Sequence, residues 1–193
     1  MRSVLNILYN CHWIVPGEAA RSAQPYMGFW EHHLRSNGIR SIINLRGAHP
    51  EWGWWQKEAW CCRRLRIKHF NLSMNSRRLP TRVLLLGLLE TFDAAPRPFL
   101  IKCSGGQDRT SLASALFLLH RYGWMAEEEA TKQFDRFPYL HMPRQNQMWL
   151  RAFPVFAREA ANGTSLVSWI QQQYDPVVLE RWLSEHGIAP IDR

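Results

Sequence analysis

The sequence lacks any hydrophobic run long enough to cross a membrane, since no stretch reaches the ~18 to 20 continuous apolar residues that a bilayer span requires. Its first residues, MRSVLNILYNCHWIV, are briefly apolar, but they lack the extended apolar core and the small-residue cleavage site of a secretory signal. We therefore expect a cytoplasmic protein and leave peripheral contact with a membrane open.

Cysteine is also scarce, and its spacing is uninformative about metals or disulfides. The four cysteines, Cys11, Cys61, Cys62 and Cys103, show neither metal-ligand spacing nor a framework of spaced pairs. This pattern favours a reduced, intracellular setting and no structural disulfides. We predict no metal and no cofactor.

Acidic residues are outnumbered, with 16 Asp and Glu against 24 Lys and Arg, which gives a net charge of +8. Such a balance favours an acidic partner, which can be nucleic acid, an anionic membrane surface or a phosphorylated substrate. The basic residues are dispersed, and the densest stretches are RRLRIK at 63–68 and SRRLPTR at 76–82. No nucleic-acid-binding motif accompanies them, so we expect no nucleic-acid partner and regard a solvated basic face as the simplest account.

What the chain does contain is enough apolar material for one packed domain, with 46% hydrophobic residues in 193 positions and no internal repeat. Strands are predicted at 18–22, 39–45, 67–72 and 99–102, and those at 39–45 and 99–102 are expected to be buried. Helices are predicted at 24–38, 54–65, 80–95, 110–122, 126–134 and 144–160, and Pro80 suits the first position of its helix. This alternation predicts an α/β, three-layer fold with a mainly parallel central sheet flanked by helices.

We divide the chain into an N-terminal extension at 1–14, a main domain at 15–161, and a C-terminal helical extension at 162–193 that packs on that domain. We expect one or two amphipathic helices in the C-terminal extension. The tryptophans of EWGWWQKEAW cannot all face one side of a single helix, so some are expected on the surface. Trp52, Trp54 and Trp55 suit a pocket rim or a membrane-facing patch, or packing against the core.

The stretch LIKCSGGQDRTSLASALFLL places a loop between a buried strand and a buried helix, where ligands bind in parallel sheets. Gly105 and Gly106 allow successive backbone N–H groups to point inward, and the helix N-terminus adds a positive field. Arg109 can hold two phosphate oxygens as a planar fork. The loop therefore predicts a phosphate-binding cradle formed by Ser104, Gly105, Gly106, Gln107, Asp108 and Arg109.

The same positive field acts on Cys103, because a thiol at a helix N-terminus beside an arginine has a lowered pKa. A thiolate beneath a bound phosphate is a nucleophile in position. Thr110 can donate its hydroxyl to Cys103 and ease departure of the thiolate. The simpler alternatives are a small buried apolar role for Cys103 and an ordinary ion pair for Arg109.

The spacing C-x5-R followed by Thr, here CSGGQDRT, resembles the signature of the cysteine-dependent protein tyrosine and dual-specificity phosphatase superfamily. VPGEAARSAQP and GIRSIINLRG resemble the opening of its bacterial dual-specificity-like branch, which often reads pGxxyRSaQP and GIktVInLR. The likeness covers about Val15 to Ala160. It implies that Cys103 is the nucleophile of a two-step phosphoryl transfer, that Arg109 and the loop amides bind phosphate, and that Thr110 assists the leaving thiolate.

Many members of that superfamily carry an aspartate, which protonates the leaving oxygen, on a loop after the strand that corresponds to IKHFNL. This chain has no acidic residue between Asn71 and Pro80. Asp108 is the substitute. D-R-T resembles the loops of myotubularin-like phosphatases, of bacterial lipid or inositide phosphatases and of some bacterial tyrosine phosphatases, where the loop aspartate is proposed to be the acid. Capping of the following helix is the alternative role, and the two are compatible. Asp93 is the other nearby carboxylate, and we assign it to a helix end.

Two positions depart from the resemblance. Lys102 stands where the superfamily commonly has a histidine, and a lysine there also favours a thiolate. Gln107 stands where several inositide phosphatases have a lysine, which disfavours polyphosphoinositides.

Other basic residues are candidates for contact with substrate or for support of the loop. Arg21 and Arg46 lie at predicted strand ends, where they either face the loop or buttress it, and support is the better interpretation. Arg77 and Arg78 lie in the segment that lacks the usual acid and either meet an acidic substrate or are simply exposed. His141 is more typical of a packed or capping histidine. Possible substrate contacts are therefore Lys102, Arg46, Arg77 and Arg78.

The sequence thus predicts a metal-independent phosphomonoester phosphatase that acts through a cysteinyl-phosphate intermediate on phosphotyrosine in a phosphoprotein. A phosphoinositide or other phospholipid head group is the alternative substrate. A pseudophosphatase that binds phosphate without turnover is the alternative from another class. The intact Cys103, Arg109 and Thr110 argue against it, whereas the missing loop acid argues for it.

Overall fold

The computed structural model describes residues 4–24 and 29–188. Within these residues a five-stranded sheet has the order β1-β2-β5-β3-β4. β1 pairs with β2 in the antiparallel sense, and the other neighbours are parallel. This arrangement confirms the predicted mainly parallel sheet. The strands are β1 (His12–Val15), β2 (Ala19–Ser22), β3 (Ser41–Asn44), β4 (Lys68–Asn71) and β5 (Phe99–Lys102).

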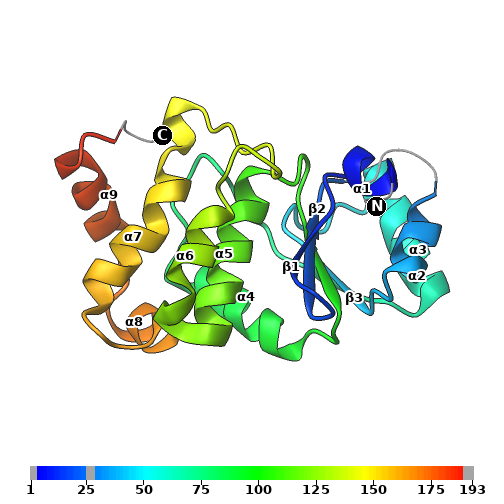
Figure 1. Ribbon diagram of the computed structural model, residues 1–193, viewed down its shortest axis with the longest axis horizontal. Helices are drawn as coiled ribbons and strands as arrows, with labels where there is room; N and C mark the ends of the chain where they lie inside the picture. Colours follow the sequence, from blue (N-terminus) through cyan, green and yellow to red (C-terminus); the bar gives the residue numbers. More distant parts are fainter. Residues whose placement is uncertain (1–3, 25–28, 189–193) are drawn as a thin grey trace.

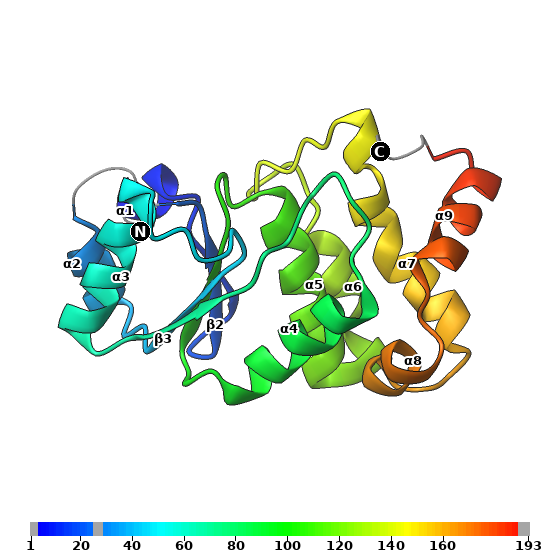
Figure 2. The ribbon, with the colours of Figure 1, turned by 180° about the vertical axis from the view of Figure 1, so that it is seen from behind.

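Helices cover both faces of the sheet, as Figures 1 and 2 show. One face carries α2 (Trp30–Ser36) and α3 (Gly53–Leu65), with the short α1 (Val4–Leu8) at its edge. The other face carries α4 (Arg82–Ala94), α5 (Asp108–Tyr122) and α6 (Glu127–Lys132). A further layer on that side is formed by α7 (Trp149–Ala161), α8 (Leu166–Gln172) and α9 (Pro176–Glu185). The described residues also include two short 3-10 helices, η1 (Gly123–Ala126) and η2 (Gln145–Gln147).

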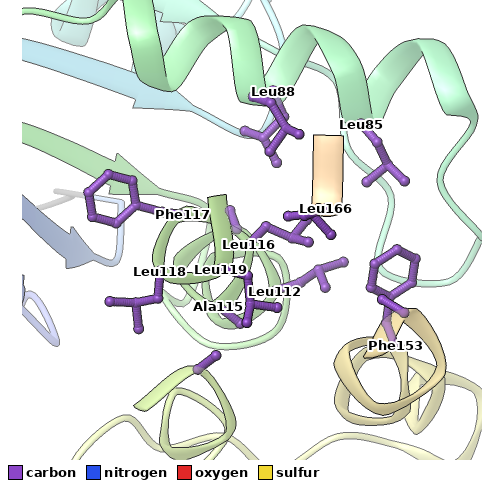
Figure 3. Packing of buried hydrophobic residues seen from close by; sticks show 14 of the residues in the cluster. Leu85, Leu88, Leu112, Ala115, Leu116, Phe117, Leu118, Leu119, Phe153 and Leu166 are labelled. Atoms are coloured by element: carbon purple, nitrogen blue, oxygen red, sulfur yellow. The ribbon is translucent and has the colours of Figure 1, made fainter. Parts of the chain in front are cut away.

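Helix α5 is the centre of the larger hydrophobic cluster (Figure 3), because it is apolar almost all round. Its leucines meet α4 on one side and α7 and α8 on another, and Leu112, Leu116 and Phe117 are fully buried. The C-terminal helices join the same cluster, with the rings of Phe153 and Trp169 6.2 Å apart. Helix α5 is therefore held in place by buried apolar contacts from several sides.

Alternation along β5 sends successive side chains to opposite faces of the sheet. Phe99, Ile101 and Cys103 join the cluster around α5, whereas Leu100 joins the smaller cluster around α2 and α3. Lys102 follows the same alternation and meets Glu58 of α3. Lys102, the last residue of β5, therefore faces the layer of α2 and α3, whereas Cys103, which follows it, faces the layer of α5.

Among the boundaries that differ from the sequence-based expectation, three change how an element begins or which segment joins the sheet. Pro80 lies outside α4, which begins at Arg82 because the hydroxyl of Thr81 accepts a hydrogen bond from the backbone N–H of Leu84 at 3.2 Å. The helix expected from 144 begins at Trp149, after the 3-10 turn η2. The segment expected as an N-terminal extension contributes β1, a short edge strand that carries little periodic signal.

No helix in the part of the chain that the structure describes is long and apolar enough to cross a membrane.

Candidate active site

The loop from Cys103 to Gln107 joins the end of β5 to the start of α5. Gly106 has a positive φ of 66°, and a Cβ on it would lie 2.6 Å from the backbone N of Ala23 and the carbonyl C of Ser22. No side chain fits in that space. The loop can therefore lie directly on the backbone that follows β2 only with glycine at this position.

Arg21 of β2 supports the loop from below and is fully buried. Its Nη2 donates to the carbonyl of Gly106 at 3.0 Å and to the hydroxyl of Ser111 at 2.7 Å. Its Nη1 donates to the carbonyl and the side-chain oxygen of Gln133, at 2.8 Å and 2.9 Å. Burial lowers the pKa of Arg21 to about 10, so it stays protonated at neutral pH. These contacts favour the supporting role over contact with substrate.

Asn10 and Gln24 hold two further carbonyls of the loop, those of Gly105 and Ser104, and neither residue was predicted from the sequence. The side-chain amide of Asn10 donates to the carbonyls of Gly105 at 3.3 Å and Tyr139 at 3.0 Å. The backbone N–H of Gln24 donates to the carbonyl of Ser104 at 2.9 Å. Because Asn10 reaches the loop across more than ninety residues of chain, no local pattern reveals its role.

Cys103 lies at the base of this loop and is only 3% exposed. Burial raises the pKa of its thiol, but the Arg109 guanidinium, the Thr110 hydroxyl and the backbone N–H groups of Thr110 and Gly106 together outweigh burial and lower the pKa. The Thr110 hydroxyl is itself fully buried and has no other hydrogen-bond partner among the described residues. The thiolate is therefore favoured at this position.

Arg109 is held by backbone carbonyls. Its Nη1 donates to the carbonyl of Met74 at 3.3 Å and lies 3.5 Å from that of Leu45. Within residues 4–24 and 29–188, no carboxylate lies within salt-bridge distance of its guanidinium. The charge of Arg109 is consequently available to an anion above the loop. The segment after β4, which lacks the usual acid, supplies the Met74 carbonyl that orients it.

Asp108 is the first residue of α5, but the N-cap position belongs to Gln107. Its Oδ2 accepts a hydrogen bond from Nε2 of Gln147 at 3.1 Å, and its Oδ1 lies 3.5 Å from Nδ1 of His141. Burial raises the pKa of this carboxyl, and the hydrogen bond from Gln147 and the nearby Arg109 and Arg144 offset only part of the rise. This carboxyl thus retains a proton to higher pH than an exposed aspartate does.

Lys102 is fully buried on the opposite side of the sheet and does not reach the surface of the loop. Its Nζ lies 2.6 Å from Oε2 of Glu58 and 2.6 Å from Oε1 of Gln24. Glu58 also accepts from Nε2 of His69 at 2.9 Å. Burial lowers the pKa of Lys102 to about 8, although Glu58 opposes that shift. This placement differs from the expected contact with substrate and favours support of the strand end that carries Cys103.

Arg46 is also tied into this network. Its Nη1 donates to Oε1 of Gln24 at 3.1 Å, and its guanidinium lies 3.5 Å from the ring centroid of Trp54. Trp52 and Trp60 are 52% and 51% exposed, which confirms that the tryptophans of this stretch do not all face the core. Arg46 therefore packs beside the site, with its guanidinium over the aromatic ring of Trp54.

The remaining candidates differ in burial and in position. Arg77 and Arg78 are exposed in the segment after β4, next to Ser76, which contacts Gln147. His141 is buried, as expected for a packed histidine, and burial lowers its pKa to about 4. Asp93 pairs with His120 at 2.9 Å near the end of α4. Among the described residues, no group of three or more His, Cys, Asp or Glu side chains could hold a metal ion.

The comparison with protein families finds one match that covers most of the chain. Residues 8–167 match the family described as PTP-SAK: Swiss Army Knife protein, DSP-PTPase phosphatase domain. The match includes the loop, β1 to β5 and α2 to α7. A search of curated protein sequences gives no match to this chain.

Solved structures share the fold at low sequence identity. P. aeruginosa TpbA in complex with pTyr is 16% identical, with a TM-score of 0.57, over 95% of this chain and 94% of that one. The core catalytic domain of the PP-IP phosphatase SIW14 from S. cerevisiae is 21% identical, with a TM-score of 0.53, over 95% and 96%. PTPMT1 in complex with PI(5)P is 16% identical, with a TM-score of 0.53, over 78% and 99%. These likenesses establish the dual-specificity-phosphatase-like fold.

The contact at Gly106 predicts a strong effect of one methyl group. Gly106→Ala should weaken binding of tungstate, an oxyanion probe, by at least about tenfold in titration calorimetry, because alanine at this positive φ costs about 1 kcal/mol before the clash is counted. Gly105→Ala is the matched control, since its Cβ would meet only the Gln107 side chain at 3.5 Å. Equal affinity in the two variants would contradict a loop seated on the backbone of residues 22 and 23.

The charge of Arg109 predicts the reactivity of the thiols. Iodoacetamide at pH 7 should modify Cys103 first, because burial raises the pKa of Cys11 to about 12 and of Cys61 to about 11. Arg109→Met removes the positive charge that lowers the Cys103 pKa, so the midpoint of the rate against pH should move upward. Peptide mass spectrometry measures both, with Arg121→Met on the same helix as the control. An unchanged midpoint in Arg109→Met would show that Arg109 does not set the thiolate.

Proposed function

Because this chain belongs to the PTP-SAK family of DSP-PTPase phosphatase domains, we propose that it hydrolyses phosphomonoesters through Cys103, with phosphotyrosine in proteins as its substrate. The chain is a cysteine-dependent phosphatase of the dual-specificity type. The observation that carries the proposal is the lowered pKa of the Cys103 thiol beneath a loop whose Arg109 has no carboxylate partner in the described part of the chain.

In the first step, the phosphate oxygens meet the backbone N–H groups of the loop and the guanidinium of Arg109. Sγ of Cys103 attacks phosphorus, so an S–P bond forms and the P–O ester bond breaks. The leaving oxygen takes a proton from the carboxyl of Asp108. The raised pKa of that carboxyl supports this role, because it favours the protonated form before the reaction.

In the second step, water attacks the phosphorus of the cysteinyl phosphate and gives a proton to the Asp108 carboxylate. The S–P bond breaks, phosphate leaves, and the sulfur departs as a thiolate. The hydroxyl of Thr110, which lies against the sulfur, donates to that thiolate and makes it a better leaving group. The enzyme returns to its starting protonation state.

Two observations support phosphotyrosine. Gln107 occupies the position in which a lysine would meet further phosphates, and it leaves a single strong phosphate site with Arg109. TpbA, which shares the fold, was crystallised with pTyr.

A phospholipid head group is the second candidate, and one surface feature favours it. The segment that carries His141 and Gln147 exposes Phe137 and Met142, which are 71% and 59% exposed, and Arg144 lies on the same segment. Apolar side chains beside a cation suit the interface of an anionic membrane. PTPMT1, which shares the fold, was crystallised with PI(5)P.

The proposed roles predict two kinetic signatures. Cys103→Ser should abolish hydrolysis of p-nitrophenyl phosphate measured in the presence of EDTA.

Asp108→Asn should lower kcat for an alkyl phosphate by about 10²-fold and for p-nitrophenyl phosphate by much less, because an alkoxide needs the proton more. Asp93→Asn, an aspartate near the end of α4, is the control and should leave both rates unchanged. Equal slowing of both esters by Asp108→Asn would count against the acid role.

A comparison of kcat/KM decides the substrate class. The kcat/KM for a phosphotyrosyl peptide should exceed that for soluble short-chain PI(5)P by at least tenfold, because the site has one loop and one arginine and binds one phosphate. If the phosphoinositide is instead preferred, and vesicles of anionic lipid raise the rate further, the second candidate replaces the first.

A further inference from the structure

The imidazole of His141 is unusual because it is buried without a partner. Its side chain is 1% exposed, and neither ring nitrogen has a hydrogen-bond partner among the described residues. The ring packs edge-on against Phe134, with 5.3 Å between centroids. A buried polar group without a partner is costly, so such a group points to a use. The polar atom facing it is Oδ1 of Asp108, 3.5 Å from Nδ1.

Gln147 approaches the same carboxyl from the other side, and its orientation is determined by its contacts. Its Oε1 accepts from the backbone N–H of Arg144 at 3.1 Å. Its Nε2 therefore faces Asp108 Oδ2 at 3.1 Å and Ser76 Oγ at 2.9 Å. An exchange of the amide oxygen and nitrogen would place the amide nitrogen against the backbone N–H of Arg144, two donors facing each other, so the amide can lie only this way.

These contacts decide which oxygen of Asp108 carries the proton of its acid form. Oδ2 accepts an N–H from Gln147, so it is the carbonyl-like oxygen. The proton consequently belongs on Oδ1, the atom that faces the free ring nitrogen of His141. The distance of 3.5 Å is long for a hydrogen bond, as catalytic contacts often are before substrate binds.

We propose that Gln147 and His141 are positioning residues for the general acid. Gln147 holds Oδ2 of Asp108, and Nδ1 of the neutral His141 ring accepts a hydrogen bond from the protonated Oδ1 until the leaving oxygen arrives. The inference rests on the proposed role of Asp108 as the acid. On substrate binding the Oδ1 proton moves from this contact to the ester oxygen as the P–O bond breaks. The water of the second step returns a proton to Oδ1.

The charges around the cluster suit this arrangement. Arg109 and Arg144 face Asp108, and Arg21 and Arg151 face His141. Burial first, and then the two arginines, keep the His141 imidazole neutral at physiological pH, with a pKa of about 4. A neutral imidazole can accept a proton in a hydrogen bond, whereas an imidazolium would drive Asp108 to the carboxylate.

The cluster also gives a role to the segment after β4, which lacks the usual acid. Ser76, from the segment after β4, accepts from Gln147, and its carbonyl accepts from Nε1 of Trp149 at 3.0 Å. The segment that lacks a carboxylate therefore anchors Gln147, which in turn orients the carboxylate of Asp108. The acid stands in the phosphate loop, but its geometry is set by two other segments.

The test measures kcat against pH for an alkyl phosphate and for p-nitrophenyl phosphate. Gln147→Leu should lower the alkyl-to-aryl ratio of kcat by about tenfold, and it should move the high-pH limb upward, because it removes a hydrogen bond that lowers the Asp108 pKa. Gln145→Leu, the same change at an exposed position of the same turn, should alter neither. Gln147→Glu is a second variant of nearly the same shape and should also move the limb upward.

His141→Phe should lower the alkyl-to-aryl ratio as well, but it should move the high-pH limb downward, since it removes the acceptor that favours the acid form. Thermal melting first establishes that each variant is folded. Opposite shifts for the two residues support the proposal, because a purely structural defect would not split them. Shifts in the same direction, or no shift, would overturn it.

A double variant separates this inference from the proposed function. In an Asp108→Asn background, Gln147→Leu and His141→Phe should cause no further loss in the alkyl-to-aryl ratio, because their target is gone. A further loss would overturn the inference while leaving the enzyme intact. If the unaltered protein and Cys103→Ser are equally inactive toward p-nitrophenyl phosphate, the proposed function itself fails.

Discussion

The buried guanidinium of Arg21 is the interaction on which the site depends. It joins β2, the carbonyl of Gly106, the first turn of α5 and Gln133 beyond α6 through four hydrogen bonds. Removing it would leave several buried acceptors without a donor, each at a cost of about 1–3 kcal/mol. Because the Gly106 carbonyl is held below, the backbone N–H groups of the loop are left for the sulfur and for a phosphate. The position of the loop and its electrostatic field therefore have the same cause.

The surroundings of each ionisable group decide its role, as two pairs of like groups show. Burial raises the pKa of Cys11, whereas Cys103 is also buried but has a lowered pKa because Arg109 and Thr110 face it. Burial also opposes ionisation of Glu58, but His69 and Lys102 outweigh it, so its pKa is lowered and it serves as a structural anion. Asp108 lacks such strong partners and keeps a raised pKa. Identical chemical groups are thereby assigned to structure or to reaction.

Much of the fold and the centre of the site could be predicted from the sequence. The buried strand at 99–102, the all-apolar helix after it and the Cys103-to-Thr110 spacing are contiguous, so local pattern carries their meaning. The supporting residues could not be predicted in the same way. Asn10 was assigned to an extension, and Gln147 lies in a short 3-10 turn that was expected to be the start of a helix. Lys102 was expected near substrate, but strand alternation turns it toward Glu58.

The sequence by itself determined the alternating fold, the phosphate-loop spacing and the absence of a carboxylate between Asn71 and Pro80, because each is a property of neighbouring residues. Only the tertiary structure decided which side chains face Asp108. Those contacts join residues 33 to 39 positions apart, as in Asp108 with His141 and Gln147, and their geometry depends on how β-strands and loops pack. A pKa depends on burial and on charges a few ångströms away, and neither is a property of the linear sequence.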